Sequence, residues 1–254
     1  MQRQKIALDI SDGLARITFV DPERHNTVDL AFTKQLSDAA IRCESDPTVK
    51  VVLLCSNGRV FSFGGDLNEF LANRDDIQPH VRRMTAYFHS ALLTLKRMPA
   101  PLVVAVGGMA AGGGFSIACT ADMTIAKRTA KFCSAYTRSG LTPDGGGTFF
   151  LPRLVGPQKA FDIMATNPVL SADEACALGV IARVVDDEKF DTEVESVITS
   201  LMALPSESLS RLKGLLHKSL DVSLEQQFEN EAKSIAEIAA TEATLQTLES
   251  FLKN

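Results

Sequence analysis

Asp144 stands between a proline and three glycines in the segment GLTPDGGGTFFLPRLVG, residues 140–156. Thr-Pro-Asp-Gly is typical of a turn, because Pro143 presets φ, the Asp144 side chain can bond nearby backbone, and Gly145 tolerates left-handed angles. A carboxylate that a turn presents beside an apolar run can also serve as a general acid or base. The segment alone favours a mere turn, and it leaves the catalytic interpretation open.

Two further glycine-rich segments each lie between a predicted strand and a predicted helix. They are FSFGGDLNEF, residues 61–70, and MAAGGGFSIACTAD, residues 109–122. The first backbone N–H groups of a helix have no intrahelical acceptor and attract negative charge. Two such groups aimed at one oxygen would form an oxyanion hole that stabilises an enolate. For either loop alone, a tight strand-to-helix turn is the favoured interpretation.

The elements that must position these loops alternate between strands and helices. Continuous apolar runs are typical of strands buried on both faces, and apolar residues at helical spacing predict helices. The repeated unit of strand, glycine-rich loop and helix predicts an α/β fold. In chain order, the patterns predict a hairpin around Ser11-Asp12-Gly13, a helix that begins at Asp29, a strand at 49–56, a helix over about 77–98, a strand at 101–108 and a short strand at 123–126.

The part of the chain after Gly156 is predicted to be almost entirely helical. In LSADEACALG, Ser171 is a helix N-cap and Gly179 marks the helix end, and IARVVDD adds one short strand. The last 32 or so residues are rich in alanine and glutamate, which indicates a helical appendage rather than a second core.

Composition excludes several classes of protein. The 254 residues carry a net charge of -5, which argues against a general nucleic-acid binder, because such proteins need a basic field. The five cysteines are scattered and without a C-x-x-C pair, so neither a disulfide framework nor a zinc site is indicated. No apolar stretch has the roughly 20 residues needed to span a bilayer, and the first residues lack a signal-peptide pattern. We therefore expect a soluble, cytoplasmic protein.

The order and spacing of FSFGGDLNE, AAGGGFSIACTAD and GLTPDGGGTFFLPRLVG resemble the crotonase (enoyl-CoA hydratase/isomerase) superfamily. DPERHNTVD at 21–29 and LSADEACALGVIARVV at 170–185 extend the resemblance over nearly the whole chain. It implies a crotonase-like spiral of ββα units with a helical C-terminal region. Residues 1–190 would form the core that binds acyl-CoA, and residues 191–254 would serve trimerisation and pocket closure. A homotrimer or hexamer is implied, and coenzyme A would enter as part of the substrate, not as a separate cofactor.

The same resemblance assigns roles to individual residues. The thioester oxygen would lie between the backbone N–H groups of Gly65 and Gly113. A lysine is common in the family where Asn68 stands, so the resemblance does not carry a phosphate contact to that position. No metal ligand is implied. The residues expected to bind substrate or coenzyme A are Arg24, His25, Phe63, Gly65, Asp66, Leu67, Asn68, Gly113 and Tyr136.

Two departures from the family pattern favour an isomerase. The hydratases of the family use two glutamates, and the matching positions here are Ser116 and Tyr136, neither of which is a carboxylate base near neutral pH. Asp144 falls where the Δ3,Δ2-enoyl-CoA isomerases and the ring-epoxide isomerases of phenylacetyl-CoA breakdown carry their single acid. The resemblance therefore implies that Asp144 moves a proton between C2 and C4, and we expect Phe149, Phe150 and Leu141 to surround it.

Besides an enoyl-CoA hydratase-like enzyme, two alternatives stay open. Aryl-CoA dehalogenases of the superfamily use an aspartate at this place as a nucleophile, together with a histidine in the long helix whose counterpart is His89. Tyr136 stands where those enzymes have tryptophan, and the helical pattern places His89 on the face opposite the core stripe, which favours a structural role. The second alternative is a noncatalytic acyl-CoA-binding protein.

The remaining basic residues are assigned structural or solvated positions. His25, His80 and His217 have no spacing for metal or triad chemistry. Lys213 and Lys218 are expected on a helix surface, in solvent.

Overall fold

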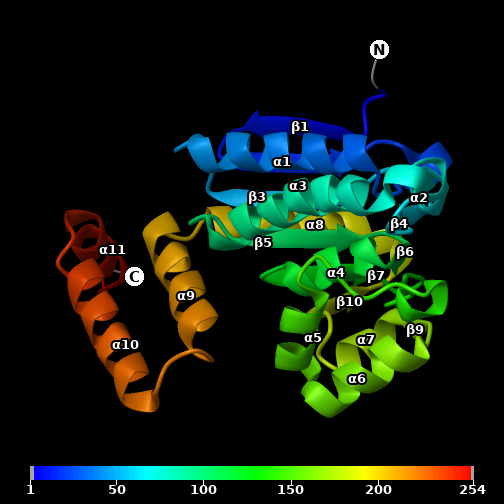
Figure 1. The fold of residues 1–254 in the computed structure, drawn as a ribbon. Coiled ribbons are helices and arrows are strands. Elements are labelled where there is room, and N and C mark those ends of the chain that lie inside the picture. The colour runs from blue at the N-terminus through cyan, green and yellow to red at the C-terminus, as the bar shows by residue number, and fades with distance from the viewer. Residues whose placement is uncertain (1–2, 253–254) are drawn as a thin grey trace.

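The computed structural model describes residues 3–252, and its centre is a six-stranded sheet (Figure 1). The strand order is β1-β2-β3-β5-β7-β10. Asp12 and Gly13 both have positive φ, 50° and 87°, so the first two strands are joined by the predicted hairpin turn. All the later pairs are parallel. The strands are β1 Ile6–Ser11, β2 Leu14–Phe19, β3 Val51–Ser56, β5 Leu102–Val106, β7 Met123–Lys127 and β10 Arg183–Val185.

A second sheet of four short strands lies beside the first, in the order β4-β6-β8-β9. Its first three members each follow a strand of the large sheet, so the chain alternates between the two sheets. In two cases a helix directly follows the large-sheet strand and the short strand after it, which gives the units β3-β4-α2 and β5-β6-α4. The expected ββα repeat is therefore present. The short strands are β4 Val60–Ser62, β6 Met109–Ala111, β8 Lys131–Cys133 and β9 Leu170–Ser171.

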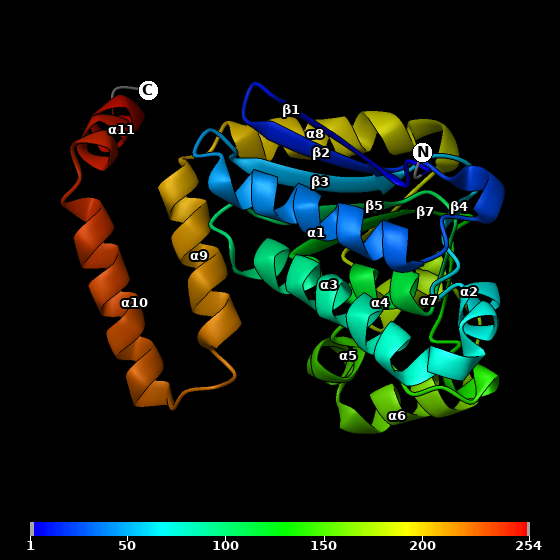
Figure 2. The same cartoon turned by 45° about the horizontal axis from the view of Figure 1, so that its top comes forward.

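Helices cover both faces of the large sheet. On one face α1, Leu30–Ser45, and α3, Ile77–Arg97, lie side by side over the main apolar core (Figure 2). On the other face α8, Phe190–Met202, closes a smaller apolar cluster with residues of β3, β5 and β7. The Asp29 side chain accepts a hydrogen bond from the Phe32 N–H, which confirms the predicted start of α1.

Short helices fill the space between the two sheets and the end of α3. The helix α4 is buried over its whole length, and in α7 Ser171 and Glu174 form a capping box. These helices are α2 Leu67–Ala72, α4 Gly113–Thr120, α5 Gly147–Val155, α6 Pro157–Thr166 and α7 Ala172–Ala177.

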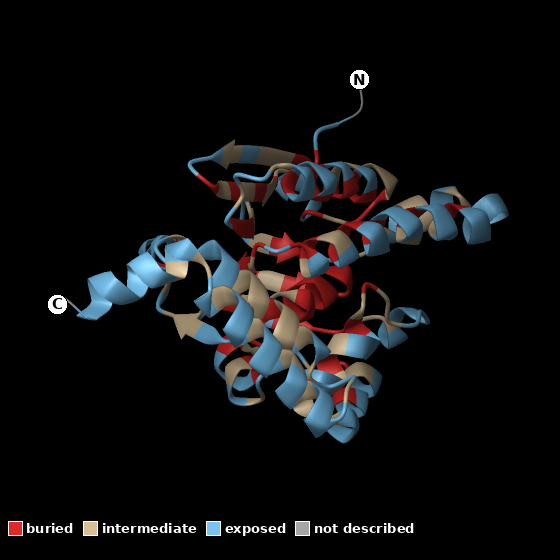
Figure 3. Cartoon of the chain, turned by 90° about the vertical axis from the view of Figure 1, so that its left-hand side faces the viewer, coloured by how far each residue is buried: buried red, intermediate tan, exposed pale blue. Residues whose placement is uncertain are grey.

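The last three helices form an arm that extends from the body, as expected for a helical C-terminal region (Figures 1 and 3). They are α9 Ser206–Lys218, α10 Leu224–Ala239 and α11 Glu242–Leu252. The arm exposes large apolar side chains, among them Leu216 at 65% and Phe228 at 61%. Assembly as a homotrimer or hexamer stays a prediction. None of the described helices is long and apolar enough to cross a membrane.

The expected position of Lys213 is wrong. Its side chain is 7% exposed, pairs with Asp122 at 2.9 Å, and donates to the carbonyls of Leu95 and Ala100 at 3.1 and 2.7 Å. Lys213 therefore joins α9 to the end of α3, and burial lowers its pKa. Helical spacing could not reveal this, because Asp122 and the two carbonyls lie far away in the sequence, the carbonyls 118 and 113 residues from Lys213. Lys218 is exposed, as expected.

Candidate active site

A cavity of about 260 Å³ lies between the two glycine-rich loops, helix α3 and the Asp144 turn. Most of its lining is apolar, and Asp144 is the one acidic residue in that lining. Helix α3 contributes three apolar side chains to this lining, Val81, Met84 and Phe88. The other lining residues are Val28, Thr33, Phe63, Gly65, Leu67, Phe70, Thr85, Gly112, Gly113, Ala135, Tyr136, Ser139, Leu141 and Thr142.

The two glycine-rich loops touch each other through their backbones. A Cβ at Gly64 would lie 2.7 Å from the Ala111 carbonyl oxygen and 2.8 Å from the Gly113 nitrogen. A Cβ at Gly114 would lie 2.7 Å from the Ser62 carbonyl oxygen. Glycine is therefore required at both positions for the approach of the loops.

This contact leaves two backbone donors without a protein acceptor. The neighbouring N–H groups are occupied, since Gly64 donates to Ser62 Oγ at 3.1 Å and Gly112 donates to the Cys133 carbonyl at 3.1 Å. Within residues 3–252, neither the Gly65 nor the Gly113 N–H has a hydrogen-bond acceptor. Both glycines line the cavity, so a ligand oxygen there would meet two unpaired donors.

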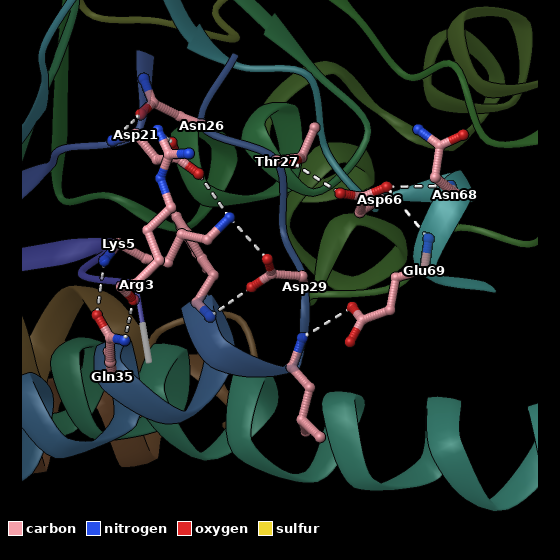
Figure 4. Close-up of polar contacts among 12 residues, drawn as sticks. Arg3, Lys5, Asp21, Asn26, Thr27, Asp29, Gln35, Asp66, Asn68 and Glu69 are labelled. Atoms are coloured by element: carbon pink, nitrogen blue, oxygen red, sulfur yellow. Dashed lines mark hydrogen bonds and ion pairs between the residues drawn. The ribbon is translucent and has the colours of Figure 1, made fainter. Parts of the chain in front are cut away.

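Side chains and backbone fasten the first loop to the segment before α1 (Figure 4). The Val28 N–H donates to the Gly64 carbonyl at 2.8 Å, and the Asp66 N–H donates to the Val28 carbonyl at 3.0 Å. The Asp66 carboxylate caps α2 and accepts a hydrogen bond from Thr27 at 3.2 Å. Gly65 is thereby held between two anchored neighbours.

Glu69 adds a second link between the first loop and both long helices. One carboxylate oxygen accepts the Leu30 N–H at the start of α1, at 3.0 Å, and the other lies 3.3 Å from Nε2 of buried His80 on α3. Burial raises the pKa of Glu69. Sequence analysis missed this residue, although an acidic residue three positions after Asp66 is a helix N-terminus signature.

A buried cluster of charges supports the same region from below (Figure 4). The Lys5 ammonium is 2% exposed and lies 2.6 Å from Asp21 and 2.7 Å from Asp29. Burial opposes its charge, but hydrogen bonds to the two carboxylates raise the pKa of Lys5. Because Asp29 also caps α1, the cluster fixes the helix start beside the first loop.

The Asp144 turn is held by two hydroxyl groups, those of Tyr136 and Ser116. The Tyr136 hydroxyl donates to Asp144 Oδ1 at 2.6 Å, and Ser116 Oγ donates to the Asp144 backbone carbonyl at 2.8 Å. Burial and the nearby Asp144 charge raise the pKa of Tyr136 well above its ordinary value, so the phenol stays a neutral donor. The Asp144 side chain is 31% exposed.

His89 also reaches the Asp144 turn. Its side chain is 50% exposed, in agreement with the helical pattern, but Nε2 lies 3.4 Å from Asp144 Oδ2 and accepts the Gly145 N–H at 3.2 Å. The pattern placed His89 opposite the core and could not show that residues 144–145 return to that face of α3.

Of the three apolar neighbours expected around Asp144, Leu141 lines the cavity and the two phenylalanines do not. The Phe149 ring stacks on Arg153 at 3.5 Å, and Phe150 packs on Gly146 and under Lys96. The expectation of a phenylalanine shield is therefore wrong. Both residues belong to α5, which turns away after Gly147.

The residues expected at the coenzyme A end lie at the rim of the cavity or outside it. Arg24 and His25 are exposed, and the His25 ring lies 4.8 Å from that of half-exposed Phe63. Leu67 is 47% exposed, and Asn68 is exposed on the first turn of α2. Residues 3–252 contain no group of three or more histidine, cysteine or acidic side chains that could hold a metal ion.

Unpaired backbone donors and a single carboxylate in an apolar cavity define an enzyme site of the oxyanion-stabilising class. Comparisons with known proteins agree. Residues 9–254 match the family described as enoyl-CoA hydratase/isomerase, and the chain belongs to this family.

Named relatives differ in their reactions. A 4-chlorobenzoyl coenzyme A dehalogenase of Arthrobacter is 32% identical over 91% of this chain and 84% of the relative. The 1,2-epoxyphenylacetyl-CoA isomerase of Escherichia coli is 32% identical over 87% of this chain and 85% of the relative. A solved enoyl-CoA hydratase of Mycobacterium smegmatis is 26% identical, with a TM-score of 0.92 over 99% of this chain and 97% of the other. The predicted crotonase-like fold is confirmed, and the family alone does not choose among the reactions.

Proposed function

We propose that this protein is an acyl-CoA isomerase in which Asp144 is the single acid/base. The observation that carries the proposal is the lining of the cavity, where Asp144 is the one carboxylate and the unpaired N–H groups of Gly65 and Gly113 are the donors. The family's usual glutamate positions hold the hydroxyls of Ser116 and Tyr136. A site with one proton acceptor suits a reaction that moves a proton and adds no water.

The reaction has two proton transfers. Asp144 removes a proton from C2 of a 3-enoyl thioester, and the electron pair of the broken C–H bond enters the thioester carbonyl. The Gly65 and Gly113 N–H groups stabilise the resulting enolate oxygen. The carboxyl then delivers a proton to C4, and the double bond moves from C3–C4 to C2–C3. Ring-epoxide isomerisation, named for the Escherichia coli relative, is the second form of the proposal.

Coenzyme A is part of the substrate in this proposal, and no other cofactor is needed. The apolar lining would take the acyl group. The exposed residues Arg24, His25 and Asn68 lie near the first loop and would meet the polar part of coenzyme A. Phe63 and His25 offer two neighbouring rings there, tilted by 45° to each other.

The test is Asp144→Asn assayed with a 3-enoyl-CoA. The amide oxygen can still accept the Tyr136 hydroxyl but cannot take up a proton from carbon. We expect thioester binding to stay near wild type and turnover to fall by about 100- to 10,000-fold. Asp162→Asn, on an exposed carboxylate paired with Lys159, is the matched control and should have no effect. Full turnover by Asp144→Asn would refute the proposal.

The contact of His89 with Asp144 favours a second candidate, nucleophilic substitution on an aryl-CoA. In that reaction Asp144 Oδ2 would form an ester with the ring carbon and release halide, and water would then cleave the ester. Rapid quench with 4-chlorobenzoyl-CoA should then show the mass of the adduct on residues 140–153. A protein that binds thioesters but shows neither adduct nor isomerisation would be a noncatalytic member.

A further inference from the structure

The two oxygens of the Asp144 carboxylate have different surroundings. Oδ1 accepts the Tyr136 hydroxyl, whose raised pKa keeps it a donor. Within the described part of the chain, the one polar side chain near Oδ2 is His89, with Nε2 at 3.4 Å. A proton that Asp144 takes from carbon would therefore be carried on Oδ2, next to His89.

The nitrogen that faces Oδ2 is held as a proton acceptor. Gly145 donates its N–H to His89 Nε2 at 3.2 Å, which requires a lone pair on Nε2 and, in the neutral ring, a proton on Nδ1. An ionised Asp144 has no proton to donate to Nε2. A protonated Asp144 can donate to the same lone pair, so the arrangement is matched to the state of the carboxyl after it has taken up a proton.

The other side of His89 is open to solvent. Its side chain is 50% exposed, compared with 31% for Asp144. Its neighbour Phe88 is 2% exposed and lies against Gly113 and Gly145, which fixes α3 at this point. The ring thus joins the carboxyl to bulk water.

We propose that His89 exchanges the proton of Asp144 with bulk solvent during turnover. The Oδ2–H bond breaks as an Nε2–H bond forms, which makes the ring an imidazolium and ends its hydrogen bond with the Gly145 N–H. The half-exposed ring then gives this Nε2 proton to water and takes up another proton from water at the same nitrogen. Return of that proton from Nε2 to Oδ2 loads Asp144 with a hydrogen from solvent. In turnovers where exchange precedes delivery, the hydrogen that reaches C4 comes from water and not from C2. This inference rests on the proposed isomerase function and adds a proton path to it.

The experiment follows the origin of the hydrogen at C4. The substrate is a 3-enoyl-CoA in which both C2 hydrogens are deuterium, and the solvent is ordinary water. Mass spectrometry reports whether the 2-enoyl product holds two deuterium atoms or only the one that stays at C2. We expect wild type to lose most of the deuterium that is removed from C2. In His89→Gln the amide oxygen can still accept the Gly145 N–H, but the side chain cannot relay a proton, so retained deuterium should rise severalfold while kcat changes much less.

Two further arms separate a proton path from a structural role. Ser90→Ala, at the next exposed position of α3, should retain as little label as wild type. In His89→Gly, added imidazole should restore the loss of label in a concentration-dependent way. Equal label retention in wild type and His89→Gln, at measurable turnover, would overturn the inference. No isomerisation by wild type would instead refute the proposed function on which it rests.

Discussion

Replacement of Gly64 by alanine should disable the oxyanion donors without touching any catalytic side chain. Gly64 has φ +78°, and an added Cβ would lie 2.7 Å from the Ala111 carbonyl oxygen and 2.8 Å from the Gly113 nitrogen. Ordinary contact begins at 3.4 Å, so one loop must move by about 0.7 Å. Displacement of one donor by about 1 Å costs about 100-fold, and loss of one donor costs about 100- to 1,000-fold. We expect kcat/KM to fall by about 100-fold.

The matched control for this change is Gly179→Ala. Gly179 also has a positive φ, +81°, but its nearest neighbour, the Leu154 carbonyl oxygen, lies at 3.5 Å, and the residue is remote from the cavity. In both variants an alanine must adopt left-handed backbone angles, which lowers the free energy of unfolding by about 1 kcal/mol. Only Gly64→Ala should lose activity.

The measurement has one readout that does not depend on the reaction. The infrared carbonyl stretch of a bound, ¹³C-labelled acyl-CoA should shift to lower frequency in wild type and in Gly179→Ala, and the shift should be smaller in Gly64→Ala. A folded Gly64→Ala protein with wild-type kcat/KM and an undiminished shift would refute the assignment of the Gly65 and Gly113 donors.

Three other predictions concern titratable groups outside direct contact with the reacting carbons. Burial raises the pKa of Glu69, so its stabilising contribution is complete below about pH 4.3 and is lost as the pH rises through the folded-state value. In urea unfolding, the free energy of unfolding of Glu69→Gln should therefore rise relative to that of wild type as the pH increases over this window. The same pH dependence in both proteins would contradict this. Lys213→Met should lose about 1–3 kcal/mol of unfolding free energy, because two buried carbonyls lose their donor, whereas Lys218→Met should unfold like wild type. The tyrosinate absorbance assigned by difference to Tyr136, with Tyr136→Phe as reference, should appear only above pH 10; a signal below that would show that the phenol is not held neutral.

Most of the fold could be predicted because its signals are local. The Asp12-Gly13 turn, the helix start at Asp29 and the Ser171 N-cap each require only a few adjacent residues, and the structure confirms all three. The buried runs at β3 and β5 are equally local, since a strand covered on both faces needs apolar side chains throughout.

The candidate site was predictable only in part, because its contacts join distant segments. The glycines and Asp144 were found from loop motifs. The contact of His89 with residues 144–145 and the burial of Lys213 depend on which loop returns to which helix face, and helical periodicity does not contain that information. The prediction for Phe149 and Phe150 was wrong for the same reason, because nearness to Asp144 in the sequence does not place a side chain at the cavity.

The two departures from the hydratase pattern are structurally coupled to the Asp144 turn. Ser116 is 1% exposed and packs directly under the glycines: a Cβ at Gly145 would lie 3.1 Å from the Ser116 Cβ, and one at Gly147 would lie 2.9 Å from Ser116 Oγ. A glutamate at position 116 would therefore need the volume that the turn occupies, and would add a negative charge next to Asp144. The Tyr136 hydroxyl, bonded to Oδ1, fills the second position with a neutral donor. In this arrangement a small residue at 116 and glycines at 145 and 147 fit together around the Asp144 turn, and the cavity lining holds one carboxylate.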